Sequence, residues 1–86
     1  MASYKVVVKS SAERDLRSLP KSAIGRVYKW FEALQADPFP SQAVRLIGTK
    51  TRYRIRVGDY RIVYDVDKTL KQVTIHYVRH RRDVYR

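Results

Sequence analysis

The chain has 86 residues, which predicts one small domain over residues 1–86 with a thin hydrophobic core. It has no cysteine and only two histidines, which excludes disulfides and thiol catalysis and argues against a metal or cofactor site. The formal charge of +11 favours nucleic acid, an acidic protein or an anionic membrane as partner. Because we find neither a membrane-length apolar run nor a signal-peptide pattern, we expect a cytoplasmic protein without a membrane partner.

The positive charge is concentrated in the second half of the chain. Residues 1–43 hold 7 basic and 4 acidic side chains, whereas residues 44–86 hold 12 basic and 4 acidic ones. The second half also has 9 arginines against 3 lysines. Because the arginine fork binds phosphate in two-point geometry, we expect the functional site in this half.

The first elements are a strand and a short helix. Residues 4–8 are rich in β-formers and predict a strand. Ser10 and Glu13 have the spacing of a capping box, which indicates a helix start. Pro20 ends this helix, since proline restricts the residue before it.

A second helix is predicted from Pro20 to about Ala36. Its apolar residues recur at helical spacing and form one face: Ile24, Val27, Phe31 and Leu34, with Trp30 at the edge. The short link makes the two helices antiparallel neighbours. A loop over residues 37–51 follows, in which we expect Val44 and Leu46 to anchor against the core.

Two alternating runs, residues 52–57 and 60–66, predict a β-hairpin around Gly58-Asp59. The two-residue turn sets a register that pairs Arg56 with Arg61, Ile55 with Ile62 and Arg52 with Asp65. One face is then apolar and is expected to join the core: Tyr53, Ile55, Val57, Tyr60, Ile62 and Tyr64.

Residues 72–78 predict a third strand, with Val73, Ile75 and Tyr77 on the core face. We therefore expect an α+β fold: a small antiparallel sheet of about four strands, with the two N-terminal helices packed on one face. The first strand is expected in the same sheet.

Three arginines share the polar face of the predicted hairpin. Arg56 opposite Arg61 is a repulsive cross-strand pair, and Arg54 lies one step away. The predicted face offers them no acid, so an anionic ligand is the expected partner. Arg52 differs, because Asp65 opposite it favours a structural ion pair.

The histidines and the C-terminal aromatic residue are further candidates. A four-residue loop before the third strand would place His76 beside Arg61. His80 lies among arginines, which favour its neutral, proton-accepting form. Tyr85 is suited either to stacking on a base or to packing.

Three segments of the chain carry a family resemblance: Leu-Ile-Gly at 46–48, Tyr-Arg-Ile-Arg-Val-Gly-Asp-Tyr-Arg-Ile-Val-Tyr at 53–64, and His-Arg-Arg-Asp-Val-Tyr-Arg at 80–86. Together they resemble the RelE toxins of the RelE/ParE toxin–antitoxin superfamily. The resemblance covers nearly the whole chain. It implies a RelE/ParE-like fold and a toxin that enters the ribosomal A site and cuts mRNA there without a metal. The 2′-hydroxyl would attack its own phosphodiester.

The resemblance also implies partners. An acidic RelB-like antitoxin would wrap the basic face and silence the toxin. Ribosome and mRNA would be the targets, and operator DNA would be bound only through the toxin–antitoxin complex.

The resemblance assigns catalytic roles by position. Arg61 would bind the scissile phosphate, Arg81 would act near the leaving 5′-oxygen, and Tyr85 would orient the cleaved nucleotide. Arg54 and Arg56 occupy positions where well-known relatives carry lysines. Further contacts to RNA phosphates are expected from nearby basic side chains: Lys50, Arg45, Arg52, Arg79, Arg82 and His76.

Arginine cannot replace lysine as a base, since its pKa lies above about 12. A base would have to be Lys50, His80, His76 or Tyr85, of which His80 is chemically the most suitable. Alternatively, positioning and charge stabilisation carry the rate without a strong base.

Three rival functions stay open at this point. A ParE-like toxin would inhibit DNA gyrase without nuclease chemistry. A plain nucleic-acid-binding module would use the same charge without catalysis. A degenerate toxin would keep only antitoxin and operator binding.

Overall fold

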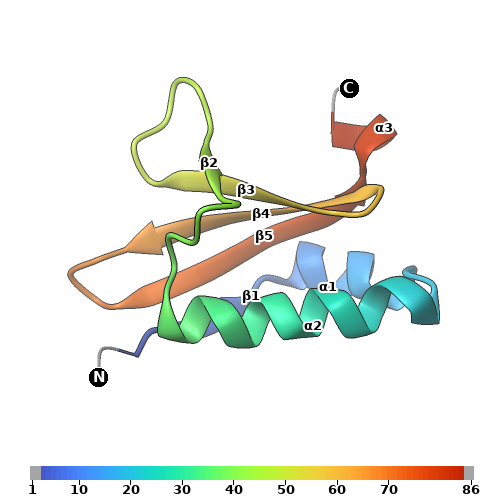
Figure 1. Cartoon of the computed structure of the whole chain (residues 1–86), viewed down its shortest axis with the longest axis horizontal. Coiled ribbons are helices and arrows are strands. Elements are labelled where there is room, and N and C mark those ends of the chain that lie inside the picture. The colour runs from blue at the N-terminus through green and yellow to red at the C-terminus, as the bar shows by residue number, and fades with distance from the viewer. Residues whose placement is uncertain (1–2, 85–86) are drawn as a thin grey trace.

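The computed structural model describes residues 3–84, which form a two-layer α+β fold (Figure 1). The elements are, in chain order, β1 (Lys5–Val8), α1 (Ser10–Arg17), α2 (Lys21–Ala36), β2 (Val44–Arg45), β3 (Arg52–Val57), β4 (Tyr60–Asp67), β5 (Gln72–His80) and α3 (Arg81–Val84). The strands form one sheet in the order β1-β5-β4-β3-β2.

The sheet is mixed and has five strands, which corrects the expected antiparallel sheet of about four. β1 joins the same sheet, as expected, but runs parallel to β5, with Val6 paired to Val73. β2 lies within the expected loop and pairs with β3. Its two residues are too few to show an alternating pattern, which is why the sequence gives no sign of it.

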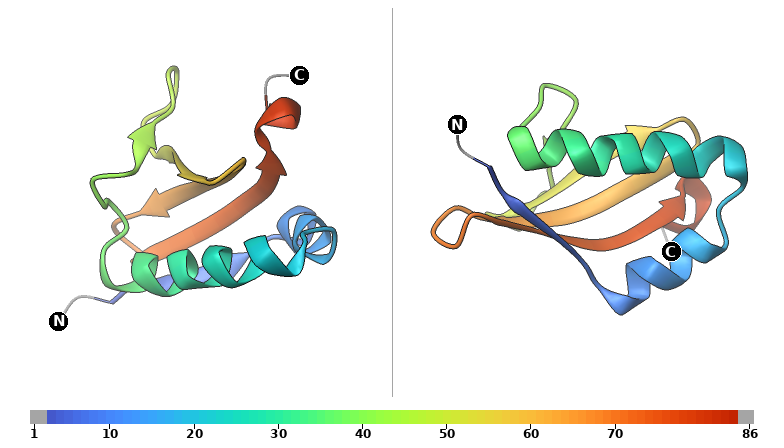
Figure 2. Two further views of the ribbon diagram at one scale, coloured as in Figure 1. Left: turned by 45° about the vertical axis from the view of Figure 1, so that its right-hand side comes forward. Right: turned by 90° about the horizontal axis from the view of Figure 1, so that it is seen from below.

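α1 and α2 cover one face of the sheet (Figure 2). α1 begins at Ser10, as expected, but the capping box does not form, because the side chains make no capping hydrogen bond. Instead the Glu13 N–H donates to the Lys9 carbonyl at 2.9 Å. α2 begins directly after Pro20, whose fixed φ and missing N–H suit a helix start.

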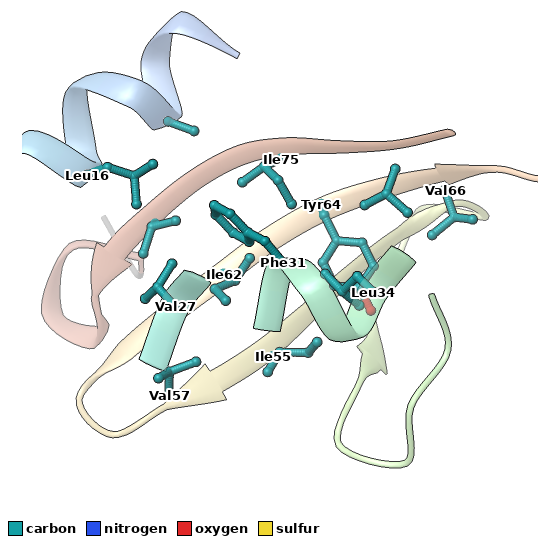
Figure 3. Packing of buried hydrophobic residues seen from close by; sticks show 13 residues of the cluster. Leu16, Val27, Phe31, Leu34, Ile55, Val57, Ile62, Tyr64, Val66 and Ile75 are labelled. Atoms are coloured by element: carbon teal, nitrogen blue, oxygen red, sulfur yellow. The ribbon is translucent and has the colours of Figure 1, made fainter. Parts of the chain in front are cut away.

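The core lies between the helices and the sheet (Figure 3). Val27, Phe31 and Leu34 on α2 face Ile55 and Ile62 on the central strands, and all five side chains are buried. Burying each such side chain contributes roughly 1.5–3 kcal/mol. The helical period of the sequence therefore identified the helix face that faces the core.

Tyr64 ties the central sheet to the segment after α2. Its hydroxyl donates to the Pro38 carbonyl at 2.9 Å, and its ring stacks on Tyr53 at 5.9 Å between centroids. Burial raises the pKa of Tyr64, and the nearby Tyr53 and Asp37 raise it further.

The register of the β3–β4 hairpin is confirmed, including Arg56 opposite Arg61 and Arg52 opposite Asp65. The next hairpin differs from the expectation. Its loop has the expected length, but a register shift places Tyr77 opposite Val63 while Ile75 lies opposite Tyr64, so His76 is an extra residue between the two pairs.

This bulge corrects two predictions about β5. Val78 takes the core position that was expected for Tyr77 and is fully buried. Tyr77 instead lies on the other face of the sheet, where it lines a cavity with Arg54 and Arg61. In the described part of the chain, none of the helices has the length and apolar character needed to cross a membrane.

Candidate functional site

The face of the sheet opposite α1 and α2, here called the open face, carries the candidate site. The β2–β3 connection and α3 both rise from this side (Figure 1). Strand pairing aligns three arginines from three neighbouring strands: Arg56 lies opposite Arg61, and Arg61 lies opposite Arg79. We call these three residues the arginine row.

The arginine row costs folding energy. Like charges directly opposite in a sheet are destabilising by a few tenths of a kcal/mol or more. Arg61 is only 5% exposed, and a guanidinium cannot lose its charge to relieve the repulsion. Neither Arg54 nor Arg56 forms a salt bridge with any carboxylate among the described side chains. An anion on the open face would remove the repulsion.

Arg52 differs from Arg54 and Arg56 in its surroundings, although all three lie on the same face of β3. Its guanidinium is 3.2 Å from the Asp65 carboxylate, which confirms the predicted ion pair. Asp65 also bonds to His76 Nε2 and accepts a hydrogen bond from the Thr51 hydroxyl at 3.2 Å. Burial alone would raise the pKa of Asp65, but hydrogen bonds and charge from Arg52 and His76 lower it below its ordinary value.

The prediction that His76 lies beside Arg61 is therefore wrong. The bulge brings Arg79 to that position, and His76 lies with Asp65 and Arg52. We call Arg52, Asp65 and His76 the neutralised cluster, because its carboxylate offsets the cation beside it.

Arg79 has two contacts that hold its side chain. Its Nε lies 3.6 Å from a carboxylate oxygen of Asp15 on α1, and its guanidinium lies 4.5 Å over the Tyr77 ring. The same Asp15 oxygen accepts the Val78 N–H at 3.1 Å, so α1 caps the edge of β5 beyond the end of β1.

His80 lies on the other side of the sheet from the arginine row. It pairs with Tyr60, and both residues line a cavity of about 460 Å³ beside α1, whose lining also includes Arg79 at the edge of the sheet. The two rings meet edge to face at 5.4 Å. His80 Nδ1 accepts the Arg82 N–H at 3.3 Å. This hydrogen bond engages Nδ1 within the chain, so Nδ1 is not available to accept a substrate proton.

α3 is fixed at the end of the sheet where the arginine row lies. The Arg81 N–H donates to the Asp59 carbonyl in the β3–β4 turn at 2.7 Å. Gly58 supports this turn with a φ of 59°. Arg81 and Arg82 are exposed, so their charges are available beside the arginine row. Tyr85 lies outside the described residues.

Two cavities extend along the open face and the loops beside it. One of about 440 Å³ is lined by Val44, Arg45, Leu46, Ile47, Arg54, Arg61, Val63 and Tyr77. Val44 and Leu46 thus line this cavity and do not anchor in the core. The other, of about 680 Å³, includes Arg45, Lys50 and Asp65. Lys50 therefore lies apart from the arginine row.

Sequence reasoning missed the apolar part of the site, notably Val63, Tyr77 and Ile47. The available sequence signal for Ile47 was its place in the Leu-Ile-Gly segment at 46–48, whereas its full exposure is visible only in the structure. Within residues 3–84, no group of three or more histidine, cysteine, aspartate or glutamate side chains is placed to hold a metal ion.

Residues 6–85 match the family model described as "ParE toxin of type II toxin-antitoxin system, parDE". The chain is 34% identical to toxin RelG of Mycobacterium tuberculosis over 87 residues, covering 96% of this chain and 97% of RelG. This chain belongs to the RelE/ParE family of type II toxins. It is also 27% identical over 86 residues to a toxin of Methanocaldococcus jannaschii named RelE1, covering 96% of each chain.

Solved structures agree with this family assignment. The archaeal RelE–RelB complex from Pyrococcus horikoshii matches with a TM-score of 0.82 and 31% identity, covering 94% of this chain and 97% of that one. The RelBE2 toxin–antitoxin complex from M. tuberculosis matches with a TM-score of 0.80 and 28% identity, covering 91% and 98%. The fold of this toxin is thus the RelE-like one that the sequence motifs implied.

Proposed function

We propose that this toxin is an endoribonuclease that cuts mRNA in the ribosomal A site and thereby inhibits translation. The arginine row, with Arg54 beside it, is the observation that carries this proposal. Arginines paired across neighbouring strands of an open face suit a substrate whose phosphates bind in two-point geometry. Phosphoryl chemistry also needs preorganised positive charge where negative charge develops.

The reaction is an internal transfer at one phosphodiester. The 2′-oxygen forms a bond to phosphorus while the bond to the 5′-oxygen breaks, leaving a 2′,3′-cyclic phosphate and a 5′-hydroxyl. Arg61 binds the phosphate and stabilises its developing charge, with Arg54 and Arg56 adding to the field. Arg81, at the start of α3, donates a hydrogen bond to the leaving 5′-oxygen. Tyr85 orients the nucleotide. The reaction needs no metal and no cofactor.

No strong base takes part in the proposed cleavage reaction. His80 lies on the helix-covered side with Nδ1 engaged, and His76 is held by Asp65. Arginines occupy the positions where relatives carry lysines. The 2′-proton therefore passes to solvent, and the leaving 5′-oxygen takes its proton from solvent. Positioning by the ribosome supplies the missing rate. Slow cleavage of free RNA follows from this mechanism.

The partner is an acidic RelB-like antitoxin that covers the basic surface. The matched structures from Pyrococcus horikoshii and M. tuberculosis are RelE–RelB and RelBE2 toxin–antitoxin complexes, which supports this assignment. We place both proteins in the cytoplasm, where ribosomes are found. Operator DNA is bound only by the toxin–antitoxin complex.

A second candidate function is inhibition of DNA gyrase, because the matching family model is that of ParE toxins. Two assays separate the candidates. Primer extension on ribosome-bound and free mRNA should give cuts only with ribosomes, while gyrase supercoiling is unaffected. Intact mRNA together with blocked supercoiling would establish the gyrase reading. Intact mRNA with normal supercoiling would favour a degenerate toxin or a plain binding module.

A further inference from the structure

The cavity of about 440 Å³ on the open face has an unusual lining. Five of its eight residues are apolar or aromatic: Val44, Leu46, Ile47, Val63 and Tyr77. The other three are arginines, Arg45, Arg54 and Arg61, and none of the described residues that line it is acidic. An apolar floor beside cations fits a ligand that joins a flat apolar group to a negative charge.

Ile47 at the rim of this cavity is fully exposed. Hydrogen bonds within the β2–β3 connection hold Ile47 in this exposed position. The Leu46 N–H donates to the Arg52 carbonyl at 2.9 Å, and the Thr49 hydroxyl donates to the Leu46 carbonyl at 3.0 Å. Gly48, with a φ of 84°, permits the tight turn. A ligand that covers this side chain would gain binding free energy from the apolar surface removed from water.

Tyr77 contributes a ring to the cavity. The Arg79 guanidinium lies over this ring at 4.5 Å, which fixes its orientation. Proteins that bind single-stranded nucleic acid commonly stack bases on such aromatic side chains. The β5 bulge is what turns Tyr77 toward this face, so the platform depends on one extra residue in the strand.

We propose that this cavity is a nucleobase pocket that receives the base of an mRNA nucleotide next to the cut phosphate. The base stacks on Tyr77, Val63 forms the floor and Ile47 closes the rim. Arg54 and Arg61 hold the adjoining phosphate. This inference rests on the proposed RNA cleavage and adds to it a site that selects the cut position by the shape and stacking of one base.

The test uses the full chain and a short 2′-deoxy strand that carries one 2-aminopurine, which cannot be cleaved and loses fluorescence on stacking. Wild-type protein should bind the strand and quench the fluorescence. Tyr77→Leu should weaken binding about tenfold, as expected for the loss of one stacked base, and should abolish the quench. Ile47→Ser should weaken binding severalfold, and because Ile47 is fully exposed, this variant tests the pocket without loss of core packing.

Leu70→Ser is the matched control, since Leu70 is a 69% exposed apolar residue in the β4–β5 loop, outside the cavity. It should bind like the wild type. Wild-type affinity and quenching in both Tyr77→Leu and Ile47→Ser would overturn the pocket. If only a leucine- and glutamate-rich peptide loses binding in these variants, the cavity is a protein-docking site and the proposal is wrong.

Failure of the base pocket and failure of the proposed nuclease activity give different experimental results. If wild-type toxin cuts mRNA on ribosomes but the two variants bind and quench normally, the pocket is wrong and the nuclease stands. If the variants lose the quench while the wild type does not cut ribosome-bound mRNA, the cavity binds a base, but the nuclease reading fails and with it the place of that base next to a cut. In ribosomal cut maps, Tyr77→Leu should lose base preference at one position next to the cut.

Discussion

Arg52 and Arg54 are successive outward-facing residues of β3, yet their surroundings differ completely. Arg52 lies opposite Asp65 and is 3.2 Å from its carboxylate. Arg54 lies opposite the buried Val63 and has no such ion pair among the described side chains. The same strand thus contains an arginine that serves the fold and one that the fold leaves available.

This difference separates two regions of the open face. In the neutralised cluster, the Asp65 carboxylate pairs with both Arg52 and His76. The arginine row and Arg54 concentrate positive charge over an apolar floor. Net charge alone therefore does not identify the site, because Arg52 contributes to the total of +11 in the same way as Arg54. What identifies it is that strand pairing brings cations from three neighbouring strands together, while Arg54 and Arg56 form no salt bridge with a described carboxylate.

The largest effect is expected for Arg61→Gln. Removing a preorganised donor at the phosphate should lower the single-turnover rate of mRNA cutting on ribosomes by roughly 10²–10³-fold. Primer extension over time measures this rate, with thermal unfolding as a check that the variant folds. A loss below about threefold would remove Arg61 from the reaction.

Asp65→Asn should act on the neutralised cluster. It weakens the bonds to Arg52 and His76, so the free energy of unfolding should fall by about 1–2 kcal/mol, given the partial exposure of the cluster. Urea unfolding at neutral pH measures it. An unchanged midpoint and slope would mean that the cluster adds nothing to stability.

The same cluster predicts a dependence of stability on pH. The pKa of Asp65 is lower in the folded chain than its ordinary value of 3.8, so the folded state favours the carboxylate. Its contribution is present above the ordinary pKa and is lost as the pH falls through the lowered one. Wild-type stability should therefore fall more steeply than that of Asp65→Asn below about pH 4. Parallel curves in urea unfolding at several pH values would contradict this assignment.

The smallest effect is expected in the salt dependence of RNA binding. Each phosphate contact to a single strand adds about 0.7 to the slope of log affinity against log salt. Arg54→Gln should reduce the slope for an uncleavable strand by about that amount, whereas Arg52→Gln should leave it unchanged. Equal reductions would show that both arginines contact phosphate.

The sequence predicted the β3–β4 hairpin in full because a two-residue Gly-Asp turn fixes the pairing of every following residue. It could not predict β5 in the same way, since the extra residue at His76 leaves no mark on the alternating pattern. Tyr77 and His76 were misplaced for this reason. His80 was judged by its charged neighbours, whereas strand alternation places it on the side of α1. The parallel pairing of β1 joins it to β5, which is distant in the sequence, and a local residue pattern does not predict which strand will be its neighbour.

The most direct test of the central claim compares Arg54→Gln with Arg52→Gln in a purified translation system. Primer extension would measure the rate at which ribosome-bound mRNA is cut. Arg54→Gln should slow cutting at least about tenfold, the effect of losing one charge-assisted contact, while Arg52→Gln should stay within about twofold of the wild type. Equal losses in the two variants, or a larger loss in Arg52→Gln, would contradict the separation of the open face into a structural and a functional region.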